Sequence, residues 1–367
     1  MEIKTLTPAQ LKAFIETDEF KTMPVVPIST HRALSHIANP RVAADDVIMI
    51  LAYEERRMVG YLGVLADEIF NGTTGYKCGW LSCMWVDPTL RGKGIAKQLL
   101  ATAFAKWNNH ILVTEFTAEA KALYDRSKNF DDLKSNTGLR CFLRFNTHQI
   151  LPNKKPSLKH IAPLLRLADT TANVFNSIRL SVFKPATTSN IRWQAVTAID
   201  NVLAAFIDTH QQNTFEKRTA SELNWILKYP WLKVSGPTEE STRYHFSSVA
   251  GQFKNLCYAG YNSDKRIVAF LFFSIRNGHI KLPYAFFNSA DVAAVTAKIY
   301  EVMLAENADM LTVFNPHITA HLNNKPTPFI YKRTVYRHYI ITKALSAYFT
   351  NKAQLTIHDG DADCAFT

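Results

Sequence analysis

One stretch, from Tyr76 to Trp107, constrains the fold of this chain more than any other. An apolar run from Tyr76 to Val86 predicts a strand, Asp87-Pro88 ends it, and the tetrapeptide Arg91-Gly92-Lys93-Gly94 follows. Apolar residues then recur at helical spacing, at Ile95, Leu99, Leu100, Ala103, Phe104 and Trp107. The stretch therefore predicts a strand, a glycine loop and an amphipathic helix, in that order.

The glycine loop has the properties of an anion site. The first N–H groups of a helix have no partner within the helix and carry partial positive charge, so they bind phosphate when it can come close. Gly92 and Gly94 have no side chain to block this approach, and Arg91 and Lys93 add positive charge. We therefore interpret Arg91 to Ala96 as a pyrophosphate site.

The elements around the loop distinguish it from other nucleotide sites. The apolar runs Val47 to Tyr53 and Met58 to Ala66 flank a charged turn and predict an antiparallel hairpin before the third strand. A further strand is expected from Ile111 to Phe116 and a helix from Ala118 to Ser127. The Rossmann pattern G-x-G-x-x-G and the P-loop pattern G-x-x-x-x-G-K-[ST] are both absent. Neither of those two folds is expected.

Two segments resemble the GNAT superfamily of acyltransferases. The stretch VDPTLRGKGIAKQLL, Val86 to Leu100, is similar to the acyl-CoA signature R/Q-x-x-G-x-G/A, with Arg91, Gly94 and Ala96 at the defining positions. The stretch TAEAKALYDRSKNF, Thr117 to Phe130, resembles the N-x-x-A-x-x-L-Y segment, with Ala120, Leu123 and Tyr124 in place. Thr117 stands where the family usually has Asn, and Asn129-Phe130 comes one residue later than the usual Gly-Phe.

The resemblance implies an α+β fold, an α/β three-layer arrangement in which helices flank a mixed, mostly antiparallel sheet. It implies acetyl-CoA, or another acyl-CoA, as the acyl donor, with the pantetheine arm along the strand that ends at Trp85-Val86. No metal is needed for this chemistry. The residues implied to bind the cofactor are Trp85, Val86, Arg91, Gly92, Lys93, Gly94, Ile95, Ala96 and Thr117.

The implied reaction is transfer of an acetyl or other acyl group to a primary amine by direct attack in a ternary complex. A backbone N–H near Met84 to Val86 would stabilise the oxyanion, and Tyr124 would protonate the leaving thiolate; a Tyr124 that only packs its helix onto the sheet is the alternative. Asp67 and Glu68 look exposed at a strand end and are candidate bases, although such residues are usually solvated loop charges. Cys83 is interpreted as an inert core thiol.

The second half of the chain is expected to repeat the first without the cofactor loop. A hairpin turn at Asn277-Gly278 joins two apolar runs, and only Asn288-Ser289-Ala290 separates the second run from a predicted helix. We predict a GNAT catalytic domain at 1–147, a linker with a helix at 148–190, and a second GNAT-like domain at 191–367. By analogy with tandem proteins of the family, the second domain would shape the acceptor site.

Charge and cysteine usage indicate a cytoplasmic protein. The five cysteines are widely spaced and form no C-x-x-C pair, and there is neither a signal peptide nor a membrane-spanning run. The formal net charge of +11 lies mostly after residue 147, but the only dense basic stretch is NKKPSLKH, Asn153 to His160. Nucleic-acid binding is therefore not expected.

Three readings of the function remain open at this point. The main one is an N-acyltransferase whose acceptor is a small molecule or a peptide. A non-catalytic acyl-CoA sensor, or a tRNA-dependent aminoacyl or peptidyl transferase of the same fold, are the alternatives. The aspartates of the terminal stretch HDGDADCAFT alternate as in a calcium loop, but the required Glu is missing, and a solvated or docked terminus is expected.

Overall fold

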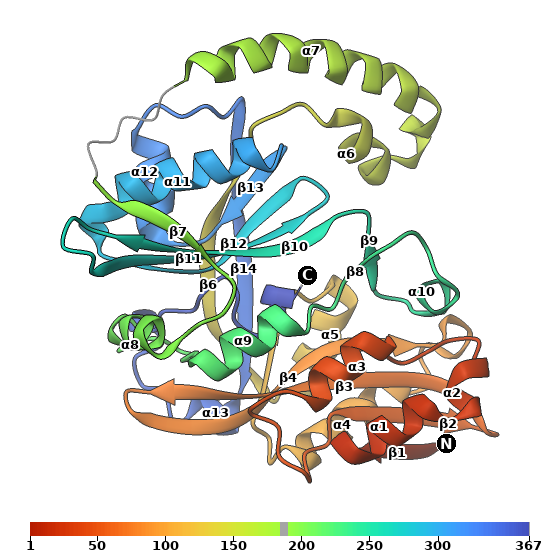
Figure 1. Cartoon of the computed structure of the whole chain (residues 1–367). Coiled ribbons are helices and arrows are strands. Elements are labelled where there is room, and N and C mark those ends of the chain that lie inside the picture. The colour runs from red at the N-terminus through yellow and green to blue at the C-terminus, as the bar shows by residue number, and fades with distance from the viewer. Residues whose placement is uncertain (184–189, 367) are drawn as a thin grey trace. The chain divides into compact units, whose positions relative to one another are not determined.

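The computed structural model describes residues 1–183 and 190–366, and the chain divides into two units (Figure 1). The first unit takes in Met1–Asn136, Val196–Asn255 and Tyr336–Thr367, and the second takes in Thr137–Ala195 and Leu256–Val335. Each unit therefore combines segments from both halves of the chain.

This interleaving differs from the contiguous domains expected at 1–147 and 191–367. Strand β6 (Phe130–Phe142) pairs through Leu139 to Phe142 with β13 (Met310–Val313) of the second unit, and β14 (Tyr331–Thr342) pairs through Tyr339 to Ile341 with β5 (Ile111–Thr114) of the first. The last strand of each half thus completes the sheet of the other half. Residues 184–189 of the predicted linker, and Thr367, lie outside the described residues.

The sheet of the first unit has the order β1-β2-β3-β4-β5-β14. Neighbouring strands are antiparallel except β4 and β5, which are parallel. The sheet is mixed and mostly antiparallel, as predicted. Its remaining strands are β1 (Glu2–Leu6), β2 (Met49–Glu54), β3 (Arg57–Asn71) and β4 (Thr74–Val86).

Helices cover both faces of this sheet, which explains why β2 and β3 are nearly continuous apolar runs. Helix α4 (Ile95–Lys106) packs its buried face, including Leu99 and Phe104, against one side. Helices α1 (Pro8–Glu16) and α3 (Thr30–Ile37) pack on the other side with Tyr61 and Cys83. Helix α5 (Ala118–Ser127) follows β5, as expected.

The sheet of the second unit has the order β6-β13-β12-β11-β10-β7, from β7 (Arg192–Val196), β10 (Phe253–Tyr261), β11 (Ile267–Arg276) and β12 (His279–Phe287). The predicted turn joins β11 and β12, and Asn277 and Gly278 both have positive φ. Its helices are α6 (Thr147–Lys154), α7 (Ala162–Val182), α11 (Val292–Ala305) and α12 (Pro316–Asn324).

Two local features of the sheets recur in both units. Strand β4 carries one extra residue opposite β3, between the pairs Leu62↔Met84 and Val64↔Leu81. Strand β12 carries one opposite β11, between Phe272↔Tyr284 and Ser274↔Lys281. Each bulged strand then pairs in parallel with the next strand for only two or three residues. The strands of the two units are therefore arranged on the same plan.

The remaining elements lie mainly in the segment from 196 to 255, which belongs to the first unit. They are α2 (Asp18–Thr22), α8 (Asn201–Thr209), α9 (Ala220–Lys228), β8 (Lys233–Val234), α10 (Glu239–Arg243), β9 (Val249–Ala250) and α13 (Lys343–Ser346).

No helix among the described residues combines the length and the apolar content needed to cross a membrane.

Candidate active site

The loop between β4 and α4 is shaped by its own residues. Asp87 accepts hydrogen bonds from the backbone N–H and the hydroxyl of Thr89, at 2.9 and 2.7 Å, and closes a 3₁₀ turn over Pro88–Leu90. Gly92 and Gly94 follow at φ values of +85° and +82°, a region that other residues enter only with strain. A Cβ at either glycine would meet no atom within 4 Å, so the requirement for glycine is conformational.

The loop leaves the N-terminus of α4 open. Gly94 is the N-cap residue and offers no capping side chain, and no acidic residue lies in the first turn. The first backbone bond of the helix runs from the N–H of Gln98 to the carbonyl of Gly94. The N–H groups of Ile95, Ala96 and Lys97 precede this bond, so they and the helix dipole favour an anion at this end.

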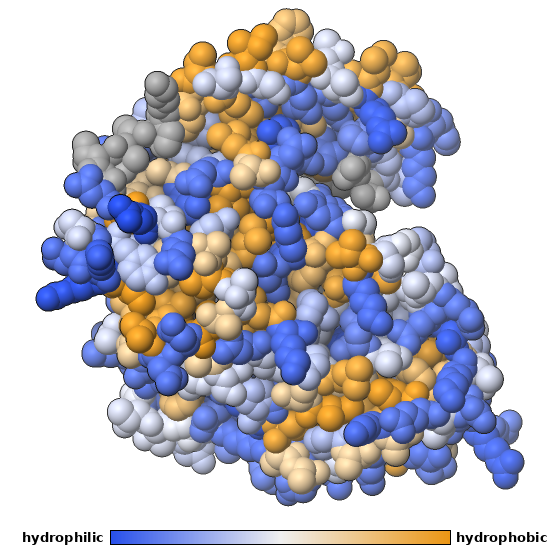
Figure 2. Space-filling view, viewed as in Figure 1, coloured by the Kyte–Doolittle hydropathy of each residue, from blue (hydrophilic) through white to orange (hydrophobic). Residues whose placement is uncertain are grey.

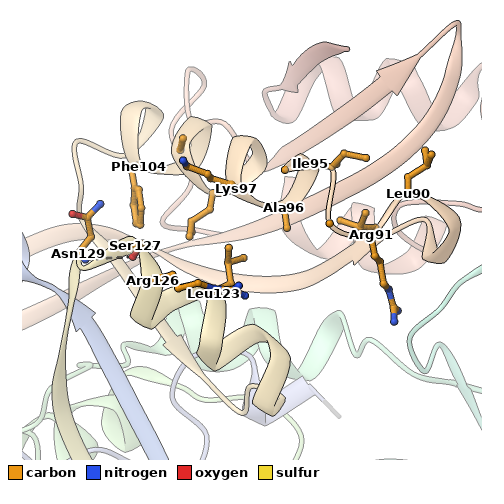
Figure 3. A pocket seen from close by; sticks show the side chains of 15 residues that line it. Leu90, Arg91, Ile95, Ala96, Lys97, Phe104, Leu123, Arg126, Ser127 and Asn129 are labelled. Atoms are coloured by element: carbon orange, nitrogen blue, oxygen red, sulfur yellow. Dashed lines mark hydrogen bonds between the residues drawn. The ribbon is translucent and has the colours of Figure 1, made fainter.

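A cavity of about 520 Å³ lies between α4 and α5, beside the loop. Figure 3 shows Ile95, Ala96, Lys97 and Phe104 on one side and Leu123, Arg126 and Ser127 on the other. Its charged lining residues are Arg91, Lys97 and Arg126, and none of the described lining residues is a carboxylate. The cavity therefore combines an apolar wall with positive charge, which suits an anionic ligand with an apolar part.

The parallel strands next to this cavity diverge. Strands β4 and β5 are paired only at Gly79↔Ile111 and Trp80↔Leu112, although β4 runs on to Val86. The bulge in β4 falls at Ser82 and Cys83, just after the last pair. Beyond Trp80 the described pairing of β4 with β5 ends, and an exposed strand edge is a place where an extended ligand can pair with backbone groups.

Tyr124 lies on α5, and Thr117 is the residue that precedes this helix. Thr117 caps the helix and accepts a hydrogen bond from the N–H of Ala120 at 3.3 Å. The Tyr124 side chain is buried against Phe116 and Phe130, and burial raises its pKa to about 12. These contacts fit the packing role, and the role of Tyr124 as an acid stays a prediction.

The expectation that Asp67 is exposed is wrong. Its side chain is 2% exposed and forms ion pairs with Arg41 at 2.7 Å and Arg218 at 2.9 Å. Burial by itself would raise the pKa of Asp67, but the two guanidinium groups outweigh it and lower the pKa. A carboxylate held in this way is a poor base, so Asp67 is not retained as a candidate. Glu68 beside it is half-buried, and its carbonyl accepts a hydrogen bond from Arg41 at 2.7 Å.

A polar cluster at the β4 bulge was not predicted. The Arg32 guanidinium donates to Ser82 Oγ and, at 3.2 Å, to the hydroxyl of Tyr244. Ser82 Oγ in turn donates to Asp363 Oδ2 at 2.7 Å. Asp363 keeps 32% of its side chain exposed, whereas Arg32 is almost fully buried. The cluster thus presents one accessible carboxylate at the point where β4 and β5 separate.

Cys83, the other bulge residue, is buried, as predicted. Its sulfur lies 3.1 Å from the hydroxyl of Tyr244, and burial raises the pKa of the thiol. A thiol in this state is a poor nucleophile. No group of three His, Cys, Asp or Glu side chains suited to a metal ion occurs in the part of the chain that the structure describes.

The C-terminal segment docks on the first unit, one of the two outcomes expected for it. Asp359 accepts a hydrogen bond from Arg337 at 2.5 Å, and Asp361 accepts one from the N–H of His358 at 2.7 Å. Asp361 is fully buried beside Glu216, and burial raises the pKa of both carboxyl groups, that of Asp361 to about 7. This docking is what brings Asp363 to Ser82.

A second cavity, of about 680 Å³, lies at the end of β4 next to α2. The Trp85 side chain lines it together with His245, and the Trp85 ring stacks on Tyr61 with centroids 5.6 Å apart. Any contact of Trp85 with a ligand in the splay would therefore come from its backbone.

Comparison with known proteins bears on this site. Residues 45–128 match the family model for the acetyltransferase (GNAT) domain, and no curated protein sequence matches the chain. The matched stretch includes β2 to α5, the loop and the cavity residues up to Ser127. A GNAT domain is thus present at 45–128.

Three solved structures resemble the whole chain, at identities that show the fold alone. A conserved protein of Enterococcus faecalis described as a probable N-acyltransferase is 10% identical, with 95% of this chain and 74% of that one covered and a TM-score of 0.54. A GCN5-related N-acetyltransferase of Anabaena variabilis is 12% identical, with 93% and 72% covered and a TM-score of 0.52. N-myristoyltransferase of Saccharomyces cerevisiae with bound myristoyl-CoA is 11% identical, with 93% and 78% covered and a TM-score of 0.52. The fold is accordingly α+β and GNAT-like over most of the chain.

Proposed function

We propose that the first unit transfers an acyl group from acyl-CoA to a primary amine by direct attack within a ternary complex. The observation that carries the proposal is the open N-terminus of α4, preceded by two glycines at positive φ and set beside a cationic cavity and a strand splay. The helix end suits an anion, the cavity suits an apolar group, and the strand edge suits an extended arm, and all three lie close together.

The cofactor would be held by distinct parts of this site. The N–H groups of Ile95 to Lys97 bind the pyrophosphate, and Arg91, Lys97 and Arg126 neutralise phosphate charge. Lys93 adds charge at the loop. The pantetheine amides pair with the backbone of β4 up to Val86, which directs the thioester toward the bulge.

Attack requires a neutral amine. We assign the acceptance of its proton to Asp363, in place of Asp67, because Asp363 is the accessible carboxylate of the bulge cluster. The amine nitrogen bonds to the thioester carbon, its proton passes to the Asp363 carboxylate, and a β4 N–H near Met84 stabilises the oxyanion. Ser82 and Arg32 hold Asp363 in position.

Collapse of the intermediate breaks the C–S bond, and the thiolate must gain a proton. Tyr124 is the proposed donor. Its pKa of about 12 lies above that of an ordinary thiol, about 8.5, so this proton transfer is uphill and water can compete as the donor. We therefore assign Tyr124 a smaller share of catalysis than Asp363.

We also propose that the second unit is a GNAT-like repeat without a cofactor site. The recurrent bulge and the short parallel pairing in β12 support this reading. The acceptor would be a small molecule or a peptide.

The test uses the full chain. Acetyl-CoA should raise the melting temperature, and free thiol should appear when amines, amino sugars and peptides are added as a panel. Absence of stabilisation by acetyl-CoA and by longer acyl-CoAs would contradict the proposal at its first step. Stabilisation without thiol release from any member of the panel would favour an acyl-CoA sensor.

A further inference from the structure

Helix α7 has an outward face made almost entirely of apolar residues. Its inward face is fixed to the second unit: Asp169 accepts a hydrogen bond from Thr147 Oγ1 at 2.7 Å, and Asn176 donates to the carbonyl of Leu143 at 2.8 Å. The opposite face bears large side chains that are 59% to 73% exposed. They are Leu164, Leu167, Val174, Phe175, Ile178 and Val182.

These six side chains form one stripe. At about 100° per residue they fall within roughly 100° of the helix circumference, and Thr171 is the one other residue in that arc. From Leu164 to Val182 the stripe is about 27 Å long at 1.5 Å per residue. Figure 2 shows hydrophobic residues gathered along α7. An apolar stripe of this length on a helix of a water-facing surface indicates a binding face.

The charge around the stripe has one sign. Between residues 148 and 183 the chain has Lys154, Lys155, Lys159, Arg166 and Arg179, against Asp169 as the single acidic residue. Lys155, Lys159 and Arg166 are exposed, whereas Asp169 is buried and bonded to His148 and Thr147. The described part of this segment therefore offers positive charge and no exposed carboxylate.

We propose that α7 lies in the headgroup region of an anionic lipid bilayer, with the stripe turned toward the acyl chains and the basic residues toward the lipid phosphates. An apolar helix face flanked by Lys and Arg binds such a surface through buried apolar area and electrostatic attraction. The helix lies on the membrane and does not span it. This proposal is independent of the function proposed for the first unit.

A second copy of the chain fits the stripe less well. Helix pairs gain specificity from opposite charges beside their apolar seam. The exposed residues of α7 outside the arc of the stripe are Pro163, Arg166, Ala168, Thr170, Ser177, Arg179 and Ser181. Two such helices would bring positive charge against positive charge with no carboxylate between them, whereas lipid phosphates complement it.

The experiment is flotation of the full chain with vesicles of phosphatidylcholine, with and without phosphatidylglycerol. The chain should float with the anionic vesicles and much less with neutral ones, and added salt should weaken the association. Leu167→Glu and Phe175→Glu should each lower the bound fraction about tenfold or more, because a charge replaces an apolar side chain that becomes buried when the helix enters the bilayer. Val202→Glu, at a side chain of α8 that is 69% exposed, is the matched control and should bind like the parent.

Each of the following outcomes supports or overturns the lipid-binding proposal. Failure of the parent chain to float with anionic vesicles overturns the proposal, and so does unchanged binding of Leu167→Glu. Sedimentation or light scattering of the parent and of Leu167→Glu tests the second copy. A dimer that Leu167→Glu abolishes, in a chain that ignores vesicles, would make α7 an interface between copies. Release of the Lys155→Glu, Lys159→Glu double variant from anionic vesicles would support the electrostatic part.

Discussion

The junction from β4 to α4 in the first unit and the junction from β12 to α11 in the second are built from the same pieces. Each is a bulged strand, a 3₁₀ turn and a long helix. In the first unit, Arg91 to Gly94 separate the turn from the helix. In the second, the turn Ser289–Asp291 runs straight into Val292. A four-residue loop therefore separates the 3₁₀ turn from the helix in the first unit, whereas the turn leads directly into the helix in the second.

The charged residues just before the two helices also differ. The residue before α11 is Asp291, whose carboxylate interacts favourably with the positive end of that helix and repels an anion. The loop before α4 instead contains the cationic residues Arg91 and Lys93. The same backbone plan thus favours phosphate at one helix end and disfavours it at the other.

The two bulges differ in the same direction. Ser82 in β4 belongs to the polar cluster with Arg32 and Asp363, whereas the bulge of β12 contains Leu282, a core residue 3% exposed. Of these two bulges, the one in β4 has a side chain that belongs to a polar cluster. The backbone fold therefore accounts for the divergence of the strands, whereas the side chains determine which unit can position reacting groups there.

The largest expected effect tests the bulge cluster. Asp363→Asn keeps the hydrogen bond from Ser82 but cannot accept a proton, so turnover should fall about a hundredfold or more. Acyl-CoA affinity should not change. Asp264→Asn, at an exposed turn of the second unit, is the control. Retention of turnover by Asp363→Asn would remove Asp363 from the mechanism.

The next effect tests the open helix end. Arg91→Glu places an anion beside the phosphates, and the affinity for acyl-CoA should fall ten- to a hundredfold, which corresponds to about 1.4 to 2.7 kcal/mol. Titration calorimetry with CoA measures it. Lys325→Glu, an exposed cation that ends α12 of the second unit, should bind as the parent does. Equal losses in both variants would mean that net charge, and not the junction, governs binding.

A smaller effect concerns the docked segment, which belongs to the first unit. The pKa of Asp361 is about 7 in the folded chain and about 3.9 in an unfolded one. Between these values the folded state holds more protons, so the free energy of unfolding falls as pH rises from about 4 to 7. Asp361→Asn should make this slope shallower, by an amount on the order of 2 kcal/mol over the range, because Glu216 shares the titration.

Melting temperatures from pH 5 to 8 check this slope, with Asp45→Asn at an exposed position as the control. An unchanged slope in Asp361→Asn would show that the buried carboxyl groups do not titrate together in this range.

The conformation of the loop can be tested by itself. Gly94→Ala forces a side chain to adopt φ near +82°, which costs about 1 kcal/mol and should lower the melting temperature by about 2 °C. Gly236→Ala has equal space and no positive φ, so it should leave the melting temperature almost unchanged. Equal behaviour of the two variants would mean that the loop tolerates another backbone conformation.

The smallest effect concerns Tyr124. Tyr124→Phe should lower turnover by less than about tenfold and leave acyl-CoA affinity unchanged, because its raised pKa makes it a weak donor. Tyr300→Phe, a buried tyrosine of the second unit, is the matched control for loss of a buried hydroxyl. If Tyr124→Phe lowered turnover more than Asp363→Asn does, Tyr124 would contribute more to catalysis than Asp363.

The strand, the glycine loop and helix α4 were predictable from the sequence because neighbouring residues determine them. Asp87 closes the turn on Thr89, and Gly92 and Gly94 adopt positive φ without strain. The same holds for the turn at Asn277 and Gly278, whose positive φ values follow from the residue types. Family resemblance over these local motifs then indicated the acyl donor.

Only the tertiary structure decided which carboxylates can act. Asp67 is buried by Arg218, 151 residues away, and Asp363 reaches Ser82 across 281 residues. The exchange of β6 and β14 between the units depends on pairing of equally long range. Such contacts are fixed by packing and by strand edges that are complementary in space, and no periodicity or spacing along the chain records them. The sequence by itself therefore determined the glycine loop between β4 and α4, and the tertiary structure determined which carboxylates are paired and buried and which remain accessible.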